Sequence, residues 1–263
     1  MPQKLLATDL DGTLFGLRGS RANASCLRKL GQALLENSVR LVFVTGRHIE
    51  LALSAIEEHS LPLPCSIVCN VGTEIFFMDR KGGWRKDPEW EKYLSRKAKS
   101  HGFGAVSRAL GCVEGATEQE REKQGQFKRS YYMAIKGAPS ALREMRGIIR
   151  RKKIGARIIY SADPQSMLGL ADVLPKGTSK KSAVEFLRRK WGIGKACVIA
   201  AGDSGNDAQL LSGYSAIVVG NAMPDLRAAL GRGKPSKMQG RYFARRPCAC
   251  GVLEGMKHFL GVA

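Results

Sequence analysis

Short, mostly apolar runs alternate with amphipathic stretches at both ends of the chain. The runs Lys4–Thr8, Leu41–Val44 and Ile67–Cys69 have the length of buried strands, and a stretch with Leu27, Leu30 and Leu34 at helical spacing follows the first. The alternation resumes late in the chain, with a helix predicted at Lys180–Trp191 and strands at Cys197–Ala201 and Ala216–Val219. Strands that alternate with helices predict a doubly wound, Rossmann-like parallel α/β sheet.

The pattern changes between residues 79 and 171. Two candidate strands, Tyr131–Ile135 and Ile158–Tyr160, flank a basic helix there. This arrangement of predicted strands around a helix is typical of an α+β insert. We therefore predict a core formed by residues 1–78 and 172–263, interrupted by a separate α+β domain at 79–171.

The net charge of +20 raises the question of nucleic-acid binding. The basic residues are scattered, however, and lack interleaved aromatic residues. The densest run, Arg150–Lys153, follows Leu142, Met145 and Ile149 at helical spacing, which predicts the solvated end of an amphipathic helix. Steering of an anionic substrate is an alternative use of this charge, and nucleic acid is not favoured as a partner.

Seven cysteines, an odd number, lie mostly within or beside apolar segments, which predicts reduced, buried thiols. Cys65 with Cys69 and Cys248 with Cys250 resemble half of a zinc site, but no histidine lies at a matching spacing. Only a short apolar stretch precedes Asp9, without a cleavage signal or a membrane-spanning run. We expect a soluble, cytoplasmic protein.

Polar clusters follow three of the predicted strands, where ligands bind in open parallel sheets. The first is Asp9-Leu10-Asp11-Gly12-Thr13, in which Asp9 can serve as nucleophile or metal ligand and Asp11 as proton donor and acceptor. A capped turn is the structural alternative for this sequence.

The second cluster is Thr45-Gly46-Arg47, where a hydroxyl and a backbone N–H at a predicted helix N-terminus suit a phosphate oxygen. The third, Gly202 to Asp207, contains Asp203, Asn206 and Asp207, and such hard oxygen ligands suit magnesium. An Asn-Asp helix cap is the alternative. Lys180 can bring a positive charge to the same edge of the sheet.

In this order and at these spacings, the four signals resemble the motifs of the haloacid dehalogenase superfamily. The resemblance implies that Asp9 is phosphorylated, that Asp11 protonates the leaving group and then activates water, and that Thr45 and Lys180 hold phosphoryl oxygens. It also implies that Mg²⁺ is bound by Asp203, the Asp9 carboxylate and the Asp11 backbone carbonyl, with Asp207 in support. Positioning and charge neutralisation are what phosphoryl transfer requires.

The insert lies where subfamily IIB carries its C2-type cap, and its end, Asp172–Pro175, matches that subfamily. Within it, the sequence is most similar to the sucrose-6-phosphate phosphatase family. The matching stretches are Val71–Ile75, Trp90–Leu94, Asp172–Pro175, Gly202–Asp207, Gly251–Glu254 and His258–Phe259. The resemblance implies a sugar-phosphate substrate bound by Gly46, Arg47, Gly72, Thr73, Glu74, Lys128 and Asn206.

Two departures concern the sugar rather than the phosphate. The family usually has Asp-x-Asp before Leu-Pro, whereas this chain has Leu170-Ala171-Asp172 and lacks one carboxylate. The first motif ends in the general Gly-Thr-Leu rather than in the family's tryptophan-bearing form. Lys128, beside Arg129, could also be a solvated surface charge.

The sequence thus predicts a magnesium-dependent phosphatase of a sugar phosphate, with sucrose 6-phosphate as the first substrate. A related enzyme for another glycosyl or hexose phosphate, for example mannosyl-3-phosphoglycerate, is the nearest alternative. A basic nucleic-acid-binding protein with a vestigial core is the alternative from another class. Association with a sugar-phosphate synthase is a further hypothesis, which the sequence does not test.

Overall fold

The computed structural model describes residues 3–16, 20–98, 104–163, 167–231 and 240–262. The chain divides into two compact units, which we call the core unit (Met1–Arg85 and Lys180–Ala263) and the insert unit (Lys86–Ser179). Both boundaries fall several residues later than the sequence predicts. The second does so because β9 (Leu168–Pro175) pairs along its whole length with β8 (Ala156–Asp163).

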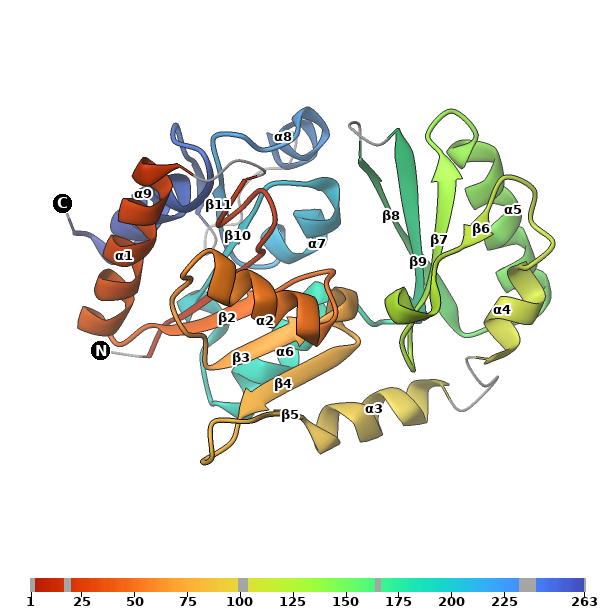
Figure 1. The fold of residues 1–263 in the computed structure, drawn as a ribbon, viewed down its shortest axis with the longest axis horizontal. Coiled ribbons are helices and arrows are strands. Elements are labelled where there is room, and N and C mark those ends of the chain that lie inside the picture. The colour runs from red at the N-terminus through yellow and green to blue at the C-terminus, as the bar shows by residue number, and fades with distance from the viewer. Residues whose placement is uncertain (1–2, 17–19, 99–103, 164–166, 232–239, 263) are drawn as a thin grey trace. The chain divides into compact units, whose positions relative to one another are not determined.

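The core unit is built on an eight-stranded sheet in the order β12-β11-β10-β1-β2-β3-β4-β5 (Figure 1). Neighbouring strands from β12 to β3 are parallel, and β3 pairs antiparallel with β4. The predicted doubly wound parallel sheet is therefore confirmed. Its strands are β1 (Leu5–Thr8), β2 (Arg40–Val44), β3 (Ser66–Cys69), β4 (Glu74–Met78), β5 (Trp84–Lys86), β10 (Val198–Gly202), β11 (Ser215–Val218) and β12 (Arg241–Phe243).

Amphipathic helices accompany this sheet. On α1, Leu27, Leu30 and Leu34 are buried, as their spacing predicts, and the helix lies beside α9 (Figure 1). Burial of three leucines stabilises the fold by about 1.5–3 kcal/mol each. The helices of the core unit are α1 (Arg21–Glu36), α2 (Ile49–Glu58), α6 (Lys180–Lys190), α7 (Ala208–Leu211), α8 (Pro224–Gly231) and α9 (Cys248–Leu260).

The insert unit has its own four-stranded antiparallel sheet, ordered β6-β7-β9-β8, with β6 at Thr117–Glu118 and β7 at Arg129–Ala134. Leu142 and Met145 of α5 belong to the same buried apolar cluster as Tyr131 of β7. The basic run predicted to end this helix is exposed. The helices of the unit are α3 (Pro88–Ala98), α4 (Gly104–Leu110) and α5 (Ala138–Arg151).

Cys26 of α1 and Cys250 of α9 form a disulfide across 224 residues. The prediction that the cysteines are reduced is therefore wrong for this pair. Helical periodicity indicates which face of α1 and of α9 is buried, but not that these two faces meet. The other five cysteines carry thiols: Cys65, Cys69, Cys112, Cys197 and Cys248.

No helix among the described residues combines the length and apolar character that crossing a membrane requires.

Candidate active site

The polar clusters predicted to form a site converge at one edge of the core sheet. Thr8, the last residue of β1, pairs with Ala201 of β10 on one side and with Phe43 of β2 on the other. The segments that leave these three parallel strands therefore emerge side by side. The residues in question are Asp9 after β1, Thr45 after β2 and Asp203 after β10.

Lys180, the first residue of α6, is almost completely buried at this edge, with 2% of its surface exposed. Its Nζ donates to Asp9 Oδ1 and Asp207 Oδ1 at 2.7 Å and to Asn206 Oδ1 at 3.0 Å. Burial alone would lower the pKa of Lys180, but the Asp207 and Asp9 carboxylates outweigh it and raise the pKa. The ammonium is thus a fixed positive charge.

Three carboxylates surround this single lysine. Asp9, Asp203 and Asp207 each offer an oxygen within 4.8 Å of the other two. Burial raises the pKa of Asp9 well above its usual range despite the attraction of Lys180, and burial together with Asp207 raises the pKa of Asp203 to about 6. Such crowding of like charges leaves an excess of negative charge, and the cluster therefore fits a bound cation.

Asp207 is fully buried and both of its carboxylate oxygens are engaged. Oδ1 accepts the Lys180 hydrogen bond, and Oδ2 accepts from the backbone N–H groups of Asp203 and Ser204 at 3.3 and 3.4 Å. Asp207 is therefore suited to orienting the lysine and the loop. The other two carboxylates of the cluster are better placed to bind a metal.

The turn after Asp9 approaches Asp203 closely. Gly12 has φ +72°, and a Cβ at this position would lie 2.3 Å from Asp203 Oδ2, so only glycine fits. The hydroxyl of the next residue, Thr13, donates to Asp203 Oδ1 at 3.2 Å. These contacts explain the glycine and threonine of the first motif.

The Asp11 carboxylate lies outside the buried cluster, with its side chain 51% exposed. Arg47 forms a bidentate ion pair with it: Nε donates to Oδ2 at 2.8 Å, and Nη2 donates to Oδ1 at 2.6 Å. These bonds raise the pKa of Arg47. The guanidinium also donates to the Leu51 carbonyl at 3.1 Å and lies 5.5 Å from the centre of the Phe15 ring. Arg47 is thus held on several sides.

Thr45 is buried, and its Oγ1 accepts a hydrogen bond from the Arg47 backbone N–H at 3.1 Å. The next helix, α2, has His48 as its N-cap and begins at Ile49. Thr45 and Gly46 therefore lie in the loop before the helix rather than at its N-terminus, where the sequence placed them. The chain passes this edge of the sheet as a loop, and α2 begins only after it.

The predicted substrate residues Gly72, Thr73 and Glu74 follow β3 in a tight turn that packs on the loop 45–47. Asn70 organises this turn: its N–H donates to that loop, its carbonyl accepts from Thr73 Oγ1 at 2.9 Å, and its side-chain amide donates to Glu74 Oε2 at 2.8 Å. Asn70 is a residue that the sequence analysis missed.

Lys128 belongs to the insert unit and is 5% exposed. Its Nζ lies 3.9 Å from Asp172 Oδ1, an oxygen that also accepts a 2.6 Å hydrogen bond from Ser130 Oγ. The lysine is buried rather than solvated, which removes the surface-charge alternative. Asp172 and Ser130 were not predicted as its neighbours, since strand register brings them together.

Comparison with known proteins finds relatives over almost the whole chain. The family model described as sucrose-6F-phosphate phosphohydrolase matches residues 2–260. A putative HAD-like hydrolase of Nitrosococcus oceani is 34% identical over 98% of this chain and 72% of its own length. A mannosylfructose-phosphate phosphatase of Agrobacterium fabrum is 31% identical over 98% of this chain and 97% of its own.

Plant relatives are longer. A probable sucrose-phosphatase 2 of Arabidopsis thaliana is 28% identical over 98% of this chain, which spans 60% of that protein. Among solved structures, the sucrose-phosphatase of Synechocystis in complex with sucrose and phosphate superposes with a TM-score of 0.81, at 24% identity and 98% coverage of both chains. A HAD subclass IIB sugar phosphatase superposes at 0.65, with 18% identity and coverage of 97% and 98%. These structures share the fold.

Proposed function

The chain belongs to the sucrose-6F-phosphate phosphohydrolase family and is a phosphatase of the haloacid dehalogenase superfamily, and on this premise we propose that it hydrolyses sucrose 6-phosphate through a phosphorylated Asp9. The observation that carries the proposal is the buried set of Asp9, Lys180, Asp203 and Asp207. It combines a carboxylate nucleophile, a fixed cation and an anionic cluster suited to a metal.

In the first step, an Asp9 carboxylate oxygen attacks phosphorus while the bond to the sugar oxygen breaks. Asp11 donates its proton to the departing sugar oxygen, and Lys180 and Thr45 hold the phosphoryl oxygens. In the second step, Asp11 takes a proton from water, whose oxygen attacks phosphorus and releases Asp9 and inorganic phosphate. Asp11 therefore acts as general acid in the first step and as general base in the second.

Magnesium is the proposed cofactor. The Asp9 and Asp203 carboxylates and the Asp11 carbonyl would hold it, and it would supply positive charge to the phosphoryl group. The three-carboxylate cluster with a single lysine is the observation that supports a divalent cation.

Substrate selection is assigned to the insert unit, with Lys128 as the residue that contacts the sugar, and to the turn at Gly72–Glu74. A second candidate substrate is mannosylfructose phosphate. It is favoured by the 31% identity to the mannosylfructose-phosphate phosphatase, which this chain matches over 97% of that enzyme's length. The synthase association and the cytoplasmic location remain predictions.

The test is release of inorganic phosphate from sucrose 6-phosphate, mannosylfructose phosphate and a panel of hexose phosphates, with Mg²⁺ and with chelator. We expect Mg²⁺-dependent turnover that Asp9→Asn lowers by on the order of 10³-fold or more, because the nucleophile is lost. Turnover of other phosphates alone would retain the mechanism and reject the sucrose assignment. Release that Asp9→Asn leaves unchanged would reject the mechanism.

A further inference from the structure

The first turn of α9 has an unusual start. Cys248, its first residue, has φ +47°, a left-handed conformation that is unfavourable for a residue with a Cβ. The N-cap, Pro247, has no side chain able to accept the free N–H groups of the turn. Such a conformation persists only where surrounding contacts hold it.

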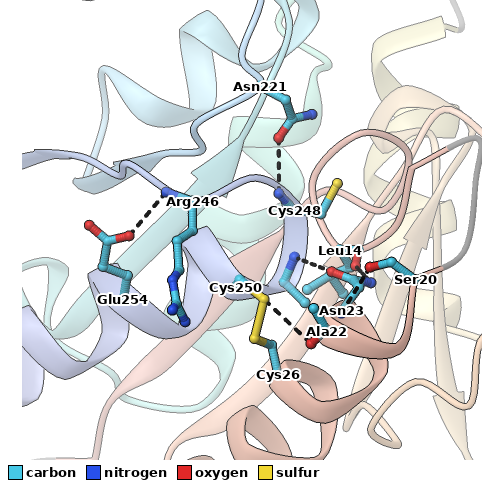
Figure 2. The surroundings of a disulfide bond; sticks show 11 residues. Leu14, Ser20, Ala22, Asn23, Cys26, Asn221, Arg246, Cys248, Cys250 and Glu254 are labelled. Atoms are coloured by element: carbon cyan, nitrogen blue, oxygen red, sulfur yellow. Dashed lines mark hydrogen bonds between the residues drawn. A yellow bond between two sulfur atoms is a disulfide. The ribbon is translucent and has the colours of Figure 1, made fainter.

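Two asparagines supply these contacts (Figure 2). Asn221 Oδ1 accepts from the Cys248 N–H at 2.9 Å, and Asn23 Oδ1 accepts from the Ala249 N–H at 3.1 Å. Asn221 follows β11, whereas Asn23 lies in the first turn of α1. Side chains from two distant segments thus cap one helix end.

The opposite ends of the same two amides hold the catalytic loop, residues 9–15. Asn221 Nδ2 donates to the Gly12 carbonyl at 2.7 Å, and Asn23 Nδ2 donates to the Leu14 carbonyl at 2.9 Å. The Cys248 sulfur, which points away from the disulfide in Figure 2, lies 3.6 Å from the same Gly12 carbonyl. Because Gly12 is packed against Asp203, a shift of α9 would reach the carboxylate cluster.

The disulfide lies at this same place. Cys26 is one turn after Asn23 on α1, and Cys250 is two residues after Cys248 on α9, with Cα atoms 5.0 Å apart. Cys250 Sγ also lies 3.5 Å from the Ala22 carbonyl. The covalent bond therefore fixes the distance between the two helices at the point where each contributes to the asparagine bridges.

We propose that Asn23 and Asn221 are positioning residues for the catalytic loop, and that the Cys26–Cys250 pair makes their action sensitive to thiol redox state. This proposal rests on the proposed function. In the redox step, a dithiol gives two electrons and two protons to the pair. The bond between the two sulfurs breaks, two cysteine thiols form, and the dithiol closes to its own disulfide.

Asparagine-to-aspartate variants separate positioning from capping. Asp at 221 or 23 still accepts the α9 N–H bond, and a negative charge suits a helix N-terminus, but it cannot donate to the loop carbonyl. We expect Asn221→Asp and Asn23→Asp to keep the unfolding midpoint and to lower kcat about tenfold, with KM changed less than twofold. Asn221→Ala should lower kcat equally, and Ala24→Asp, which adds the same charge at an exposed neighbour, should leave it unchanged.

Amide hydrogen exchange of residues 9–16 gives a readout that does not depend on activity. We expect faster exchange in both aspartate variants and in dithiol-reduced wild type, whose kcat should fall about fivefold to the value of Cys26→Ser. The Cys26→Ser/Cys250→Ser variant should not respond to dithiol. If the aspartate variants have the same kcat and the same loop exchange as the wild type, the positioning role is overturned. If the oxidised and reduced wild-type enzymes have the same kcat and loop exchange, the redox coupling is overturned. If no form hydrolyses any phosphate ester, the proposed function fails, while exchange still decides the loop contacts.

Discussion

In the part of the chain that the structure describes, each unit buries one lysine, and the two differ in how closely carboxylates pair with them. Lys180 in the core unit contacts two carboxylates and one amide oxygen within 3.0 Å. Lys128 in the insert unit is nearly as buried, yet its ion-pair partner among the described residues, Asp172, is 3.9 Å away and also accepts a hydrogen bond from Ser130. Burial is similar, whereas charge compensation is not.

The difference indicates two uses of a buried cation. A lysine that is fully paired is held in one position, which is what a group that stabilises a transition state requires. A buried lysine with a loose partner has been desolvated without full compensation, so a polar ligand can supply the missing contact. We therefore associate Lys180 with chemistry and Lys128 with selection of the substrate.

The largest test of this contrast is Lys180→Met. Removing the ammonium leaves Asp9 and Asp207 buried without their cation, so we expect turnover to fall by on the order of 10³-fold and the free energy of unfolding to fall by about 3 kcal/mol. Urea denaturation and phosphate release measure both. Lys181→Met on the same helix is the control, and equal losses there would show that the effect is not specific to the paired lysine.

Asp203→Asn tests the excess of negative charge in the core unit. The raised pKa of Asp203 means that its charged form is disfavoured in the fold, so stability is lost as pH rises from the unfolded value through about 6. At neutral pH we expect the amide to stabilise the metal-free protein by about 1 kcal/mol. Activity should fall at least about 100-fold. Thermal unfolding should show a Mg²⁺-dependent rise in wild type only, and an equal rise in the variant would place the metal elsewhere.

Lys128→Met should not cause the loss of stability expected for Lys180→Met. Because its pairing is loose, replacing it with an apolar side chain of similar length should leave the free energy of unfolding unchanged or slightly higher. We expect KM for the sugar phosphate to rise about tenfold, with kcat changed less than threefold. Lys136→Met, an exposed lysine of the same unit, is the control. A loss of kcat without a change in KM would contradict the selection role.

The smallest expected effect concerns the exposed pair. Arg47→Lys keeps the charge but not the fork that aligns the Asp11 carboxylate, so we expect kcat to fall about fivefold. Arg47→Gln should give a similar loss if alignment matters and a much larger one if charge matters. Steady-state kinetics of the two variants side by side decide between these readings.

The sequence predicted the central strands well because buried parallel strands leave short apolar runs. It did not predict β4 pairing antiparallel with β3, since the pattern of a strand does not state its direction. The second boundary of the insert was placed too early because the end of β9 is an apolar run like that of a core strand.

At the site, motif residues were identified where they follow strands directly, as with Asp9 and Asp203. Residues that act through a single side-chain amide were missed. Asn70 and Asn221 are common turn residues in sequence. Only the fold shows that the Asn221 amide joins the loop at Gly12 to the start of α9, and that Asn70 binds Glu74 through its amide and the loop 45–47 through its backbone N–H. The Cys26–Cys250 pair was missed for a related reason, since helix packing and not spacing brings the two together.

The position of Lys180 has a consequence for any attempt to replace the insert unit of this protein with another. The first junction of the insert falls inside β5, an edge strand whose Arg85 and Lys86 are exposed, where a recombined chain can absorb a changed length. The second has no spacer: Thr178 and Ser179 are buried, and the next residue is the lysine that pairs with Asp9. A chimera that carries the insert of another protein should therefore tolerate a change of length at the first junction. At the second junction it should tolerate no shift, even of one residue.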